Sequence, residues 1–573
     1  MIKNSLSLEH FRYRLSQTEA LPQLVVIGIL SGVSTGLLII LFRLVVDLPQ
    51  HFLLPSGIAE DFESLPPFLR VLLPIAGSLF LFLILYRLSP DQRRTGPVHV
   101  LERMGYHQGH MPVTNMLVQF WGAAAALISG HSVGREGPSI HLGAGCSSLL
   151  GHWLKLPNNS IRILVGCGTA AAIAAAFNTP LAGVVFAMEV VMLEYTVIGF
   201  TPVVVAAVSA DLMVRLTLGS EIDLAVPPLQ IESFHEIPFV MLVGFCIGCL
   251  AAGFNRLMVK TVSFSHTPLL LRLLLAGVLV GGSALIFPQV MGVGYDTLTN
   301  TLQGEYTLPF LLGLLLVKLL LTPIILGLGV PGGLIGPSFF IGAIAGAALG
   351  MTGALIAEQP ITHVSFYAML GMGAMMGALL NAPLAALIAL LELTGNPNII
   401  LPGMIAIVIS NLTVRYVFNL PSVFVSSLHA LGLDYRHEPI TQALSSVAVS
   451  SLMSRDFIKV SPHIERRAAE ALQNTKPDWL LACDNEHFFL LEPTDLVGFL
   501  KRAPEAHHID LVRIPALRKD LEQICYRSTL HQALSQMNDS NIDALAVTDI
   551  NQHIIGILTR EQIETSYRNN LKP

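Results

Sequence analysis

The stretch "SVGREGPSIHLGAGCSSLLG", from Ser132 to Gly151, places Arg135 and Glu136 between glycines in an otherwise apolar region. Ionised side chains are costly inside the hydrocarbon of a membrane, and they are rare there unless they serve a function. Glycine lets the backbone approach a ligand closely, and proline is tolerated in the first turn of a helix. The stretch therefore predicts a helix N-terminus, whose free N–H groups attract an anion.

The chain repeats this pattern. Gly-Pro-Ser recurs in "GGLIGPSFFIGAIAG" (Gly332–Gly346), and "AAAFNTPLAGVVFAMEV" (Ala174–Val190) resembles "GALLNAPLAALIALLEL" (Gly377–Leu393), with matching residues 203 positions apart. These matches indicate that the chain contains two related halves, at about residues 20–220 and 236–428. Repeats with Gly/Pro-interrupted helices at matching places indicate a transport site at the repeat interface. Duplication of a structural bundle is the alternative, but it leaves the glycines unexplained.

The composition is that of a multi-pass integral membrane protein. Of the 573 residues, 53% are hydrophobic and 13% are charged, against about 25% charged in soluble domains, and the mean hydropathy is +0.63. The net charge of −6 gives no reason to expect a nucleic-acid partner. The apolar region offers no nucleophile–base pair and no metal cluster, so we do not expect an enzyme. We interpret Cys246 and Cys249 as core packing.

Apolar runs of two lengths fill the region from Leu21 to Phe418. Runs near 20 residues are long enough to cross the hydrocarbon; these are Leu21–Leu41, Phe68–Leu85, Pro202–Leu218, Pro238–Phe254, Leu269–Phe287 and Leu308–Leu326. The others are too short for full crossings, and broken helices persist in a membrane only where protein or water satisfies their backbone; these are Ile140–Leu150, Leu164–Phe177, Leu181–Leu193 and Leu384–Leu393.

Basic residues predict the orientation in the membrane. Lys3, Arg12 and Arg14 precede the first span, and the loop "YRLSPDQRRTG" (Tyr86–Gly96) follows the second. Because positive loops favour the cytoplasm, we expect both ends of the chain to be cytoplasmic in a plasma (inner) membrane. Residues 1–19 show no signal-peptide pattern, so we interpret them as a retained cytoplasmic segment.

The composition changes after Asp434, where long apolar runs stop and charged residues increase. Two copies of one plan follow, each with an apolar strand, a polar turn, a second strand and a helix start. We predict a linker at 431–445 and a paired α/β module at 446–573. The copies are Leu480–Leu500 and Ile542–Glu564, preceded by helix-like stretches at Glu465–Asn474 and Leu530–Asn538.

The position of Glu136 suggests how a pathway could be gated. A carboxylate beside anion-binding amides mimics the anion: ionised, it occupies the site and blocks the path, and protonated or displaced, it leaves. The alternative is an ion pair with Arg135, but adjacent residues on a helix do not face each other.

Taken together, "GREGP" (Gly134–Pro138), "PGGLIGP" (Pro331–Pro337) and the two repeats that begin Asn-Thr-Pro and Asn-Ala-Pro resemble the CLC family of chloride channels and proton-coupled chloride exchangers. The resemblance covers about residues 20–430. It implies an α-helical polytopic membrane protein built from two inverted repeats with broken helices. It also implies a homodimer in the lipid bilayer with one chloride pathway per subunit. The C-terminal module resembles a pair of CBS domains.

A glycine stripe at Gly342, Gly346 and Gly350 allows close helix approach. We favour packing within one subunit, so the expectation of a dimer comes from the family resemblance and not from this stripe.

The resemblance assigns Glu136 as the gating glutamate. It places amides of Leu334 and Ile335 at the central anion and a hydroxyl donor at Thr95. The family's Gly-Ser-Gly-Ile-Pro loop is replaced by "RTGPV" (Arg94–Val98), and Phe424 stands where a tyrosine hydroxyl is common, so the central site should lack one donor. The full set of expected anion-binding residues is Thr95, Gly96, Arg135, Gly137, Leu334, Ile335 and Phe424.

A third departure concerns proton coupling. Family exchangers usually carry an inner glutamate one residue after the position of Glu189, and here that residue is Val190. This favours a gated chloride channel over a proton-coupled exchanger; the third alternative is a membrane sensor with vestigial transport. Glu194 is a substitute proton carrier to be considered. We interpret Glu189 and Glu392 as structural, bonded to backbone at helix ends. Voltage, pH and anion concentration all stay open as the gating stimulus.

Adenine nucleotides bind to some CBS pairs through a Thr or Ser followed three residues later by Asp. Thr559 is followed by Gln562, and Asp495 is preceded by Glu492, so neither copy is complete. Nucleotide regulation and a purely structural or dimerising role both stay open. We expect no other cofactor, and the resemblance implies chloride as the transported ion, although the sequence alone does not identify the physiological anion.

Overall fold

The computed structural model divides the chain into two compact units. The first contains Leu24–Leu154 and Ile161–Tyr435, and the second contains Met1–Gln23, Lys155–Ser160 and Arg436–Pro573. Each unit is described by itself. The structure describes residues 11–12, 15, 20–219, 236–357, 364–433, 439–475, 477–484, 487–502, 507–549 and 551–570.

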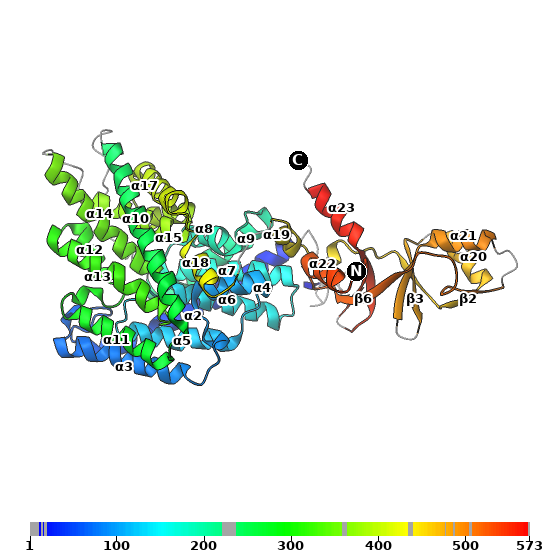
Figure 1. The fold of residues 1–573 in the computed structure, drawn as a ribbon, viewed down its shortest axis with the longest axis horizontal. Helices are drawn as coiled ribbons and strands as arrows, with labels where there is room; N and C mark the ends of the chain where they lie inside the picture. Colours follow the sequence, from blue (N-terminus) through cyan, green and yellow to red (C-terminus); the bar gives the residue numbers. More distant parts are fainter. Residues whose placement is uncertain are drawn as a thin grey trace. The chain divides into compact units, whose positions relative to one another are not determined.

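We call the unit that contains Leu24–Leu154 and Ile161–Tyr435 the membrane unit. Helices make up its first half, which contains the motif around Glu136 (Figure 1). Every apolar run that the sequence predicts in this half, whether long enough to cross a membrane or shorter, is helical. The last of them is Pro202–Leu218. The elements are α2 (Leu21–Leu53), α3 (Pro67–Leu85), α4 (Gly96–Tyr106), α5 (Val113–Ile128), α6 (Glu136–Trp153), α7 (Asn158–Phe177), α8 (Pro180–Phe186), η4 (Ala187–Met192) and α9 (Val197–Leu218).

The second half repeats this order. Its helices are α10 (Ile237–Val262), α11 (Leu269–Ala284), α12 (Tyr295–Gln303), α13 (Leu308–Gly327), α14 (Ile335–Ala357), α15 (Val364–Leu380), α16 (Pro383–Thr394), α17 (Ile400–Leu412), η9 (Thr413–Val417) and α18 (Val423–Ala430). Short 3₁₀ turns connect the helices at η2 (Phe62–Ser64), η3 (Asp91–Arg93), η6 (Ser263–His266), η7 (Pro288–Val290) and η8 (Pro397–Ile399).

Eight helices in the described ranges are long and apolar enough to cross a membrane. All six long runs predicted from the sequence are among these eight or among the shorter apolar helices. The prediction that Leu164–Phe177 is too short was wrong: α7 begins at Asn158 and has 20 residues. Its first five residues include Asn158, Asn159 and Arg162, and these polar side chains interrupt the apolar pattern at the start of the helix.

Both halves break their helices in the same way. Asn178 and Asn381 adopt positive φ angles of 57° and 54°, a left-handed conformation that asparagine tolerates better than most residues. Pro180 and Pro383 then begin α8 and α16, where the missing proline N–H costs nothing. The predicted interruptions are therefore confirmed.

Small residues bring consecutive helices together in both repeats. In α14, a side chain at Gly342 would overlap the Gly371 carbonyl oxygen of α15, and one at Gly346 would overlap that of Tyr367. In the first repeat, Gly143 of α6 and Gly168 of α7 approach each other in the same way. The glycine stripe packs within one subunit, as the sequence analysis favoured.

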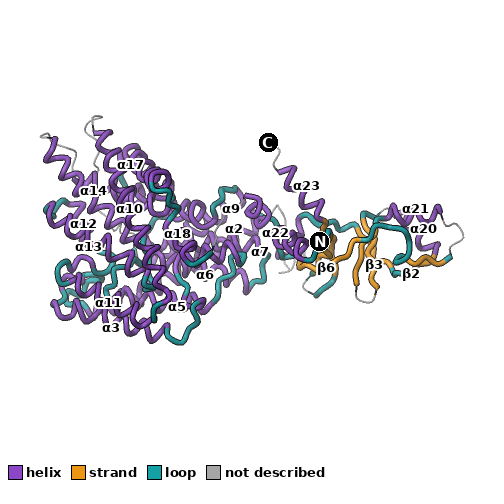
Figure 2. Tube along the Cα trace, in the orientation of Figure 1, coloured by secondary structure: helices purple, strands orange, loops and turns teal. Residues whose placement is uncertain are grey.

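Strands occur only after residue 456 in the described chain (Figure 2). Each copy of the C-terminal module contains a parallel pair and an antiparallel pair, and β4 joins β6 to form one six-stranded sheet in the order β1-β3-β4-β6-β7-β8. The predicted βα pattern is confirmed, with β1, β2, β5 and β6 as additional strands. The first copy comprises β1 (Phe457–Val460), β2 (His463–Glu465), α20 (Arg466–Thr475), β3 (Trp479–Asp484), β4 (His487–Leu491), α21 (Pro493–Arg502) and β5 (His508–Asp510). The second comprises β6 (Lys519–Cys525), α22 (Leu530–Asp539), β7 (Ala544–Thr548), β8 (Ile554–Thr559) and α23 (Arg560–Asn570).

The sequence alone does not decide the domain limits. The predicted linker 431–445 contains all but the last residue of α19 (Pro439–Ser446), and η10 (Val449–Ser451) follows that helix. Most of the predicted N-terminal segment 1–19, including Lys3 and Arg14, lies outside the described residues, as does 434–438 of the linker.

Candidate functional site

The two glycine motifs meet across the repeat boundary. The N–H of Gly134 donates to the carbonyl of Gly333 at 2.7 Å, and the N–H of Gly333 donates to the carbonyl of Gly134 at 2.8 Å. A side chain at Gly137 would lie 2.6 Å from the Gly333 Cα atom. Only glycine permits this approach, which brings the N-termini of α6 and α14 side by side.

Glu136 is fully buried at the start of α6. Its Oε2 accepts the N–H of Gly336 at 3.0 Å, and its Oε1 accepts the hydroxyl of Tyr295 at 2.8 Å. Gly336 belongs to the first turn of α14, so the carboxylate lies where backbone donors and the helix dipole favour negative charge. A side chain at Gly336 would lie 2.8 Å from Glu136 Oε2, which explains the glycine.

Arg135 does not take the place of these donors. Its guanidinium lies over the ring of Tyr295, 5.1 Å from the centroid. The carboxylate of Glu136 is held instead by a backbone amide of the other repeat and by the tyrosine hydroxyl. Tyr295 belongs to neither glycine motif, so no signal in the sequence pointed to it.

Lys318 on α13 fixes the segment that leads to Tyr295. It is fully buried, and its ammonium donates to the carbonyls of Val290 and Gly292, at 2.9 Å each. The ring of Phe340 lies 4.6 Å from the Nζ atom. Since a buried ammonium must be satisfied by acceptors, Lys318 restrains the loop before α12. A single lysine within "GLLLVKLLL" was the available signal.

At the start of α4, Gly96 has a φ of +76° and its N–H donates to the side-chain oxygen of Gln119 at 2.6 Å. Thr95 precedes the helix without capping it through its side chain. Because the Gly96 N–H needs an acceptor, the Gln119 oxygen must face it and the Nε2 group must point elsewhere. That Nε2 is buried and has no hydrogen-bond partner in the described chain. Sequence reasoning missed Gln119.

The other expected anion-binding residues are buried near the starts of helices. Leu334 and Ile335 immediately precede Gly336, with 4% and 2% of their surface exposed, and Phe424 is 1% exposed on α18. α18 packs against both α4 and α10. Their roles toward an anion stay predictions.

Glu189 and Glu392 cap helices reciprocally across the repeats. Glu392 accepts the N–H groups of Leu181 and Ala182 at 3.0 and 2.8 Å, at the start of α8. Glu189 accepts those of Leu384 and Ala385 at 3.3 and 2.8 Å, at the start of α16. The structural interpretation of both glutamates is confirmed.

Val190 follows Glu189 in the π-helical turn η4 and is buried, with 5% exposed. η4 packs against α4 and is followed by Leu193, which has a φ of 57°. Glu194 follows that residue and is partly buried. The apolar side chain of Val190 thus fills the position where the resemblance places an inner proton carrier.

In the C-terminal module, Thr559 and Gln562 satisfy each other. The N–H of Thr559 donates to Gln562 Oε1 at 2.8 Å, and the N–H of Gln562 donates to Thr559 Oγ1 at 3.3 Å. This is a capping box at the start of α23, and α22 has the same box from Thr529 and Gln532. In the first copy, Asp495 accepts the N–H of Leu517.

Comparisons with known protein families agree with this arrangement. The family described as "Voltage gated chloride channel" matches residues 77–415, and the CBS domain matches residues 515–566. The "Putative chloride channel protein ClcB-like" of Ralstonia nicotianae is 32% identical over 410 residues, covering 70% of this chain and 95% of the relative. The "H(+)/Cl(-) exchange transporter ClcA" of Vibrio cholerae is 28% identical, covering 66% and 83%.

Solved structures share the fold. A slow cyanobacterial Cl⁻/H⁺ antiporter superposes with a TM-score of 0.64 at 24% identity, covering 72% of this chain and 99% of its own. A eukaryotic CLC transporter covers 94% of this chain and 97% of its own, with a TM-score of 0.61 at 19% identity. The inverted-repeat fold with a C-terminal CBS region is therefore shown.

Proposed function

Because the chain belongs to the voltage-gated chloride channel family, whose members transport anions across membranes, we propose that it carries chloride along a pathway that the Glu136 side chain opens and closes. One observation supports this above all: the Glu136 carboxylate binds the N-terminus of α14 through Gly336. A helix N-terminus is a binding position for an anion, so the side chain and chloride compete for it.

The two states of Glu136 follow from its donors. Ionised, the carboxylate accepts hydrogen bonds from both Gly336 and Tyr295. Protonated, one of its oxygens becomes a donor and can no longer accept in the same way. The protonated side chain is therefore held less firmly, and chloride takes its place.

Partial charges hold the anion elsewhere along the path. The candidate donors are the Thr95 hydroxyl, the unpartnered Nε2 of Gln119 and the amides of Leu334 and Ile335. None of these carries a full positive charge, so chloride is bound weakly enough to leave again. Phe424 supplies no donor, which weakens the central site further.

We propose passive conduction, as in a gated channel, since Val190 cannot carry a proton. Proton-coupled exchange is the second candidate, and it is supported by the relative named an exchange transporter and by the solved antiporter of the same fold. Glu194, four residues beyond Val190, is the side chain that exchange would use first.

Reversal potentials distinguish these candidates. In liposomes with chloride and pH gradients set independently, a passive pathway follows the chloride gradient alone, and a chloride gradient moves no protons uphill. A fixed ratio of protons to chloride contradicts passive conduction. In that event Glu194→Gln separates two routes: lost coupling with intact chloride flux assigns the side chain, and unchanged coupling assigns another route.

The proposal extends to assembly and orientation. Following the family resemblance, the chain forms a homodimer with both termini cytoplasmic, since Arg87, Arg93 and Arg94 lie on the loop between α3 and α4. Light scattering of the detergent-solubilised protein that gives one chain per particle contradicts the dimer. Protease cleavage of the C-terminal module in right-side-out vesicles contradicts the orientation.

For the CBS pair we propose a structural role. Support comes from the capping box, because Thr559 and Gln562 already bond to each other at the place where a ribose would bind. Calorimetry with ATP tests this: no heat of binding is expected for the natural chain, and micromolar or tighter binding contradicts the proposal.

A further inference from the structure

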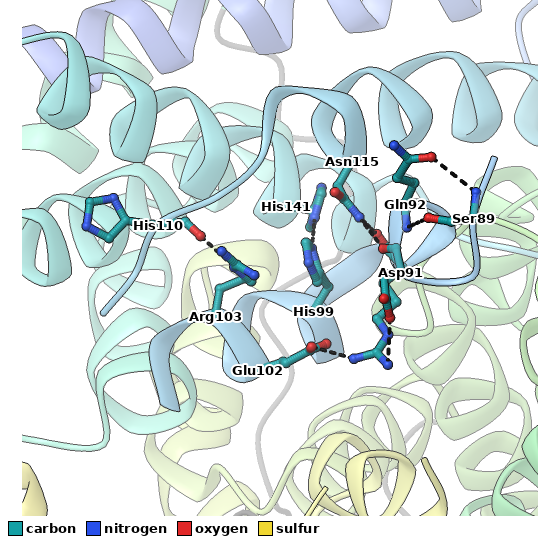
Figure 3. A network of polar contacts seen from close by, with 10 residues as sticks. Ser89, Asp91, Gln92, His99, Glu102, Arg103, His110, Asn115 and His141 are labelled. Carbon is teal, nitrogen blue, oxygen red and sulfur yellow. Dashed lines mark hydrogen bonds and ion pairs between the residues drawn. The ribbon is translucent and has the colours of Figure 1, made fainter. Parts of the chain in front are cut away.

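Two buried histidines connect α4 to α6, and the gating mechanism above does not use them. His99 Nδ1 and His141 Nε2 are 2.8 Å apart, and the ring centroids are 5.1 Å apart (Figure 3). His99 is 3% exposed and His141 is not exposed. Sequence reasoning gave neither residue a role.

Hydrogen-bond chemistry limits the proton content of the pair. A bond between two imidazoles needs one N–H donor and one bare nitrogen, so at most one of the rings carries an extra proton. His141 Nδ1, at the far side of the pair, is buried and has no hydrogen-bond partner in the described residues. Such a group is rarely left unsatisfied unless it serves a function or meets a water molecule.

His99 lines a cavity of about 360 Å³, enough for several water molecules. The wall of this cavity is held in place by polar contacts (Figure 3). Arg94 pairs with both Asp91 and Glu102, and the Asn115 amide donates to the carbonyls of Asp91 and Arg94 at 2.8 and 3.0 Å. His99 thus borders a polar space, and His141 lies behind it.

His141 lies on the same helix as Glu136, five residues later. At 1.5 Å and about 100° per residue, the two are separated by roughly 7.5 Å along the helix axis and by roughly 140° around it. The two side chains leave different faces of α6, so a chain of water molecules must connect them. Glu136 leaves its position on α14 more readily once it gains a proton, and Val190 cannot serve as a proton carrier in η4, which packs against α4.

We propose that the His99–His141 pair delivers protons from this cavity to Glu136. A proton binds His99 Nε2, the shared proton moves from His99 Nδ1 to His141 Nε2, and His141 releases its Nδ1 proton through water to the Glu136 carboxylate. One proton enters and one leaves, and both rings end neutral. The inference rests on the proposed gating role of Glu136, and it holds for passive and for coupled transport.

Other charged and titratable groups face the pair or pack nearby. His107, Arg103 and Arg94 act on His99 electrostatically, and Asp91 and Glu102 line the cavity with it. Two elements packed against α4 carry titratable groups. η4 carries Glu189, whose carboxylate accepts N–H groups at the start of α16, and α18 carries His429 in its last turn. Arg162 of α7 donates to the Met104 carbonyl at the other end of α4.

The test measures chloride flux through the reconstituted full-length chain with the pH of the two solutions set independently. Protease access to the C-terminal module assigns the orientation. In the natural chain, acid on the cavity side is expected to stimulate flux. His99→Gln and His141→Gln should lose at least tenfold of that stimulation and keep the response to the opposite side. His107→Gln, a matched change at an exposed histidine of the same cavity, should behave like the natural chain.

A cavity-side response that survives in both glutamine variants overturns the inference. If those variants misfold, His99→Ala is tested instead, with imidazole added on the cavity side, because the cavity is large enough to hold imidazole. Restored acid stimulation supports a relay. A folded His99→Ala protein that imidazole does not rescue contradicts the relay.

Glu136→Gln separates this inference from the proposed function. If the gate is assigned correctly, its flux is insensitive to pH on both sides, with or without the histidines. If the flux of Glu136→Gln still follows pH, the gate assignment fails. If Glu136→Gln is insensitive and the histidine variants still respond to cavity-side acid, only the relay fails.

Discussion

The two oxygens of Glu136 have different partners, and this difference decides how readily an anion displaces the side chain. Gly336 donates through the backbone and cannot be removed without changing α14, whereas Tyr295 donates through a hydroxyl that a single substitution deletes. Tyr295 stabilises the closed state, because it binds the carboxylate and not the departing side chain.

Tyr295→Phe should therefore favour opening. The ionised carboxylate loses one of its two donors, and a hydrogen bond to a charged group contributes about 1.5–3 kcal/mol. We expect the chloride concentration for half-maximal flux to fall roughly ten- to a hundredfold. Tyr306→Phe, which removes a hydroxyl that accepts from Asn300, is the control and should leave it unchanged. A higher chloride requirement in Tyr295→Phe would mean that this hydroxyl serves the anion instead.

Phe424 offers the opposite experiment, in which a donor is added. If its ring faces the central anion, Phe424→Tyr adds a hydrogen bond to a charged partner, worth about 1.5–3 kcal/mol. Calorimetry should then record chloride binding roughly ten- to a hundredfold tighter, with Phe424→Leu as the control that adds no donor. Unchanged or weaker binding in the tyrosine variant contradicts the placement of Phe424 at the anion.

Among the elements, the short helices α8 and α16 depend on a residue from the other repeat. Each begins with proline and exposes N–H groups that no residue of its own turn satisfies, and Glu392 and Glu189 supply the acceptors. This exchange ties the repeats together at the positions where each one breaks its helices.

Removing one of these caps should destabilise the membrane unit. Glu392→Ala leaves two amides of α8 without their acceptor, and the more buried of them, that of Ala182, costs about 1–3 kcal/mol when it is unsatisfied. Glu392→Gln keeps one acceptor oxygen and should lose less. Thermal unfolding in detergent measures both, against Glu305→Ala at an exposed site. Equal stability of Glu392→Ala and Glu305→Ala would show that the cap contributes nothing.

At the scale of the whole molecule, the features that could be predicted from the sequence are the motifs that both repeats contain. The constant spacing of 203 residues paired Glu189 with Glu392, and Gly-Pro-Ser paired the starts of α6 and α14. Both pairings correspond to contacts in the fold. The contact between Gly336 and Glu136, however, depends on how Gly134 and Gly333 align. The family resemblance assigned Leu334 and Ile335 to the central anion, and it named no partner for the Glu136 carboxylate.

The residues that were missed have no repeat partner in these motifs. Tyr295, Lys318 and Gln119 act through contacts between α12, α13 or the start of α4 and elements far away in sequence. His99 and His141 are 42 residues apart and become a pair only because α4 packs on α6. Such juxtapositions depend on tertiary packing, which neither hydropathy nor motif spacing determines.

Chloride efflux from liposomes containing Glu136→Gln, compared with the natural chain from acidic to alkaline pH, tests the gate most directly. Glutamine keeps the size of the side chain and removes the charge that competes with chloride. Efflux through the natural chain should fall as the solution becomes alkaline, and Glu305→Gln, at an exposed site, should behave in the same way. Efflux through Glu136→Gln should persist at every pH. A folded Glu136→Gln protein that passes no chloride, or whose efflux still falls at alkaline pH, would contradict a gate formed by Glu136.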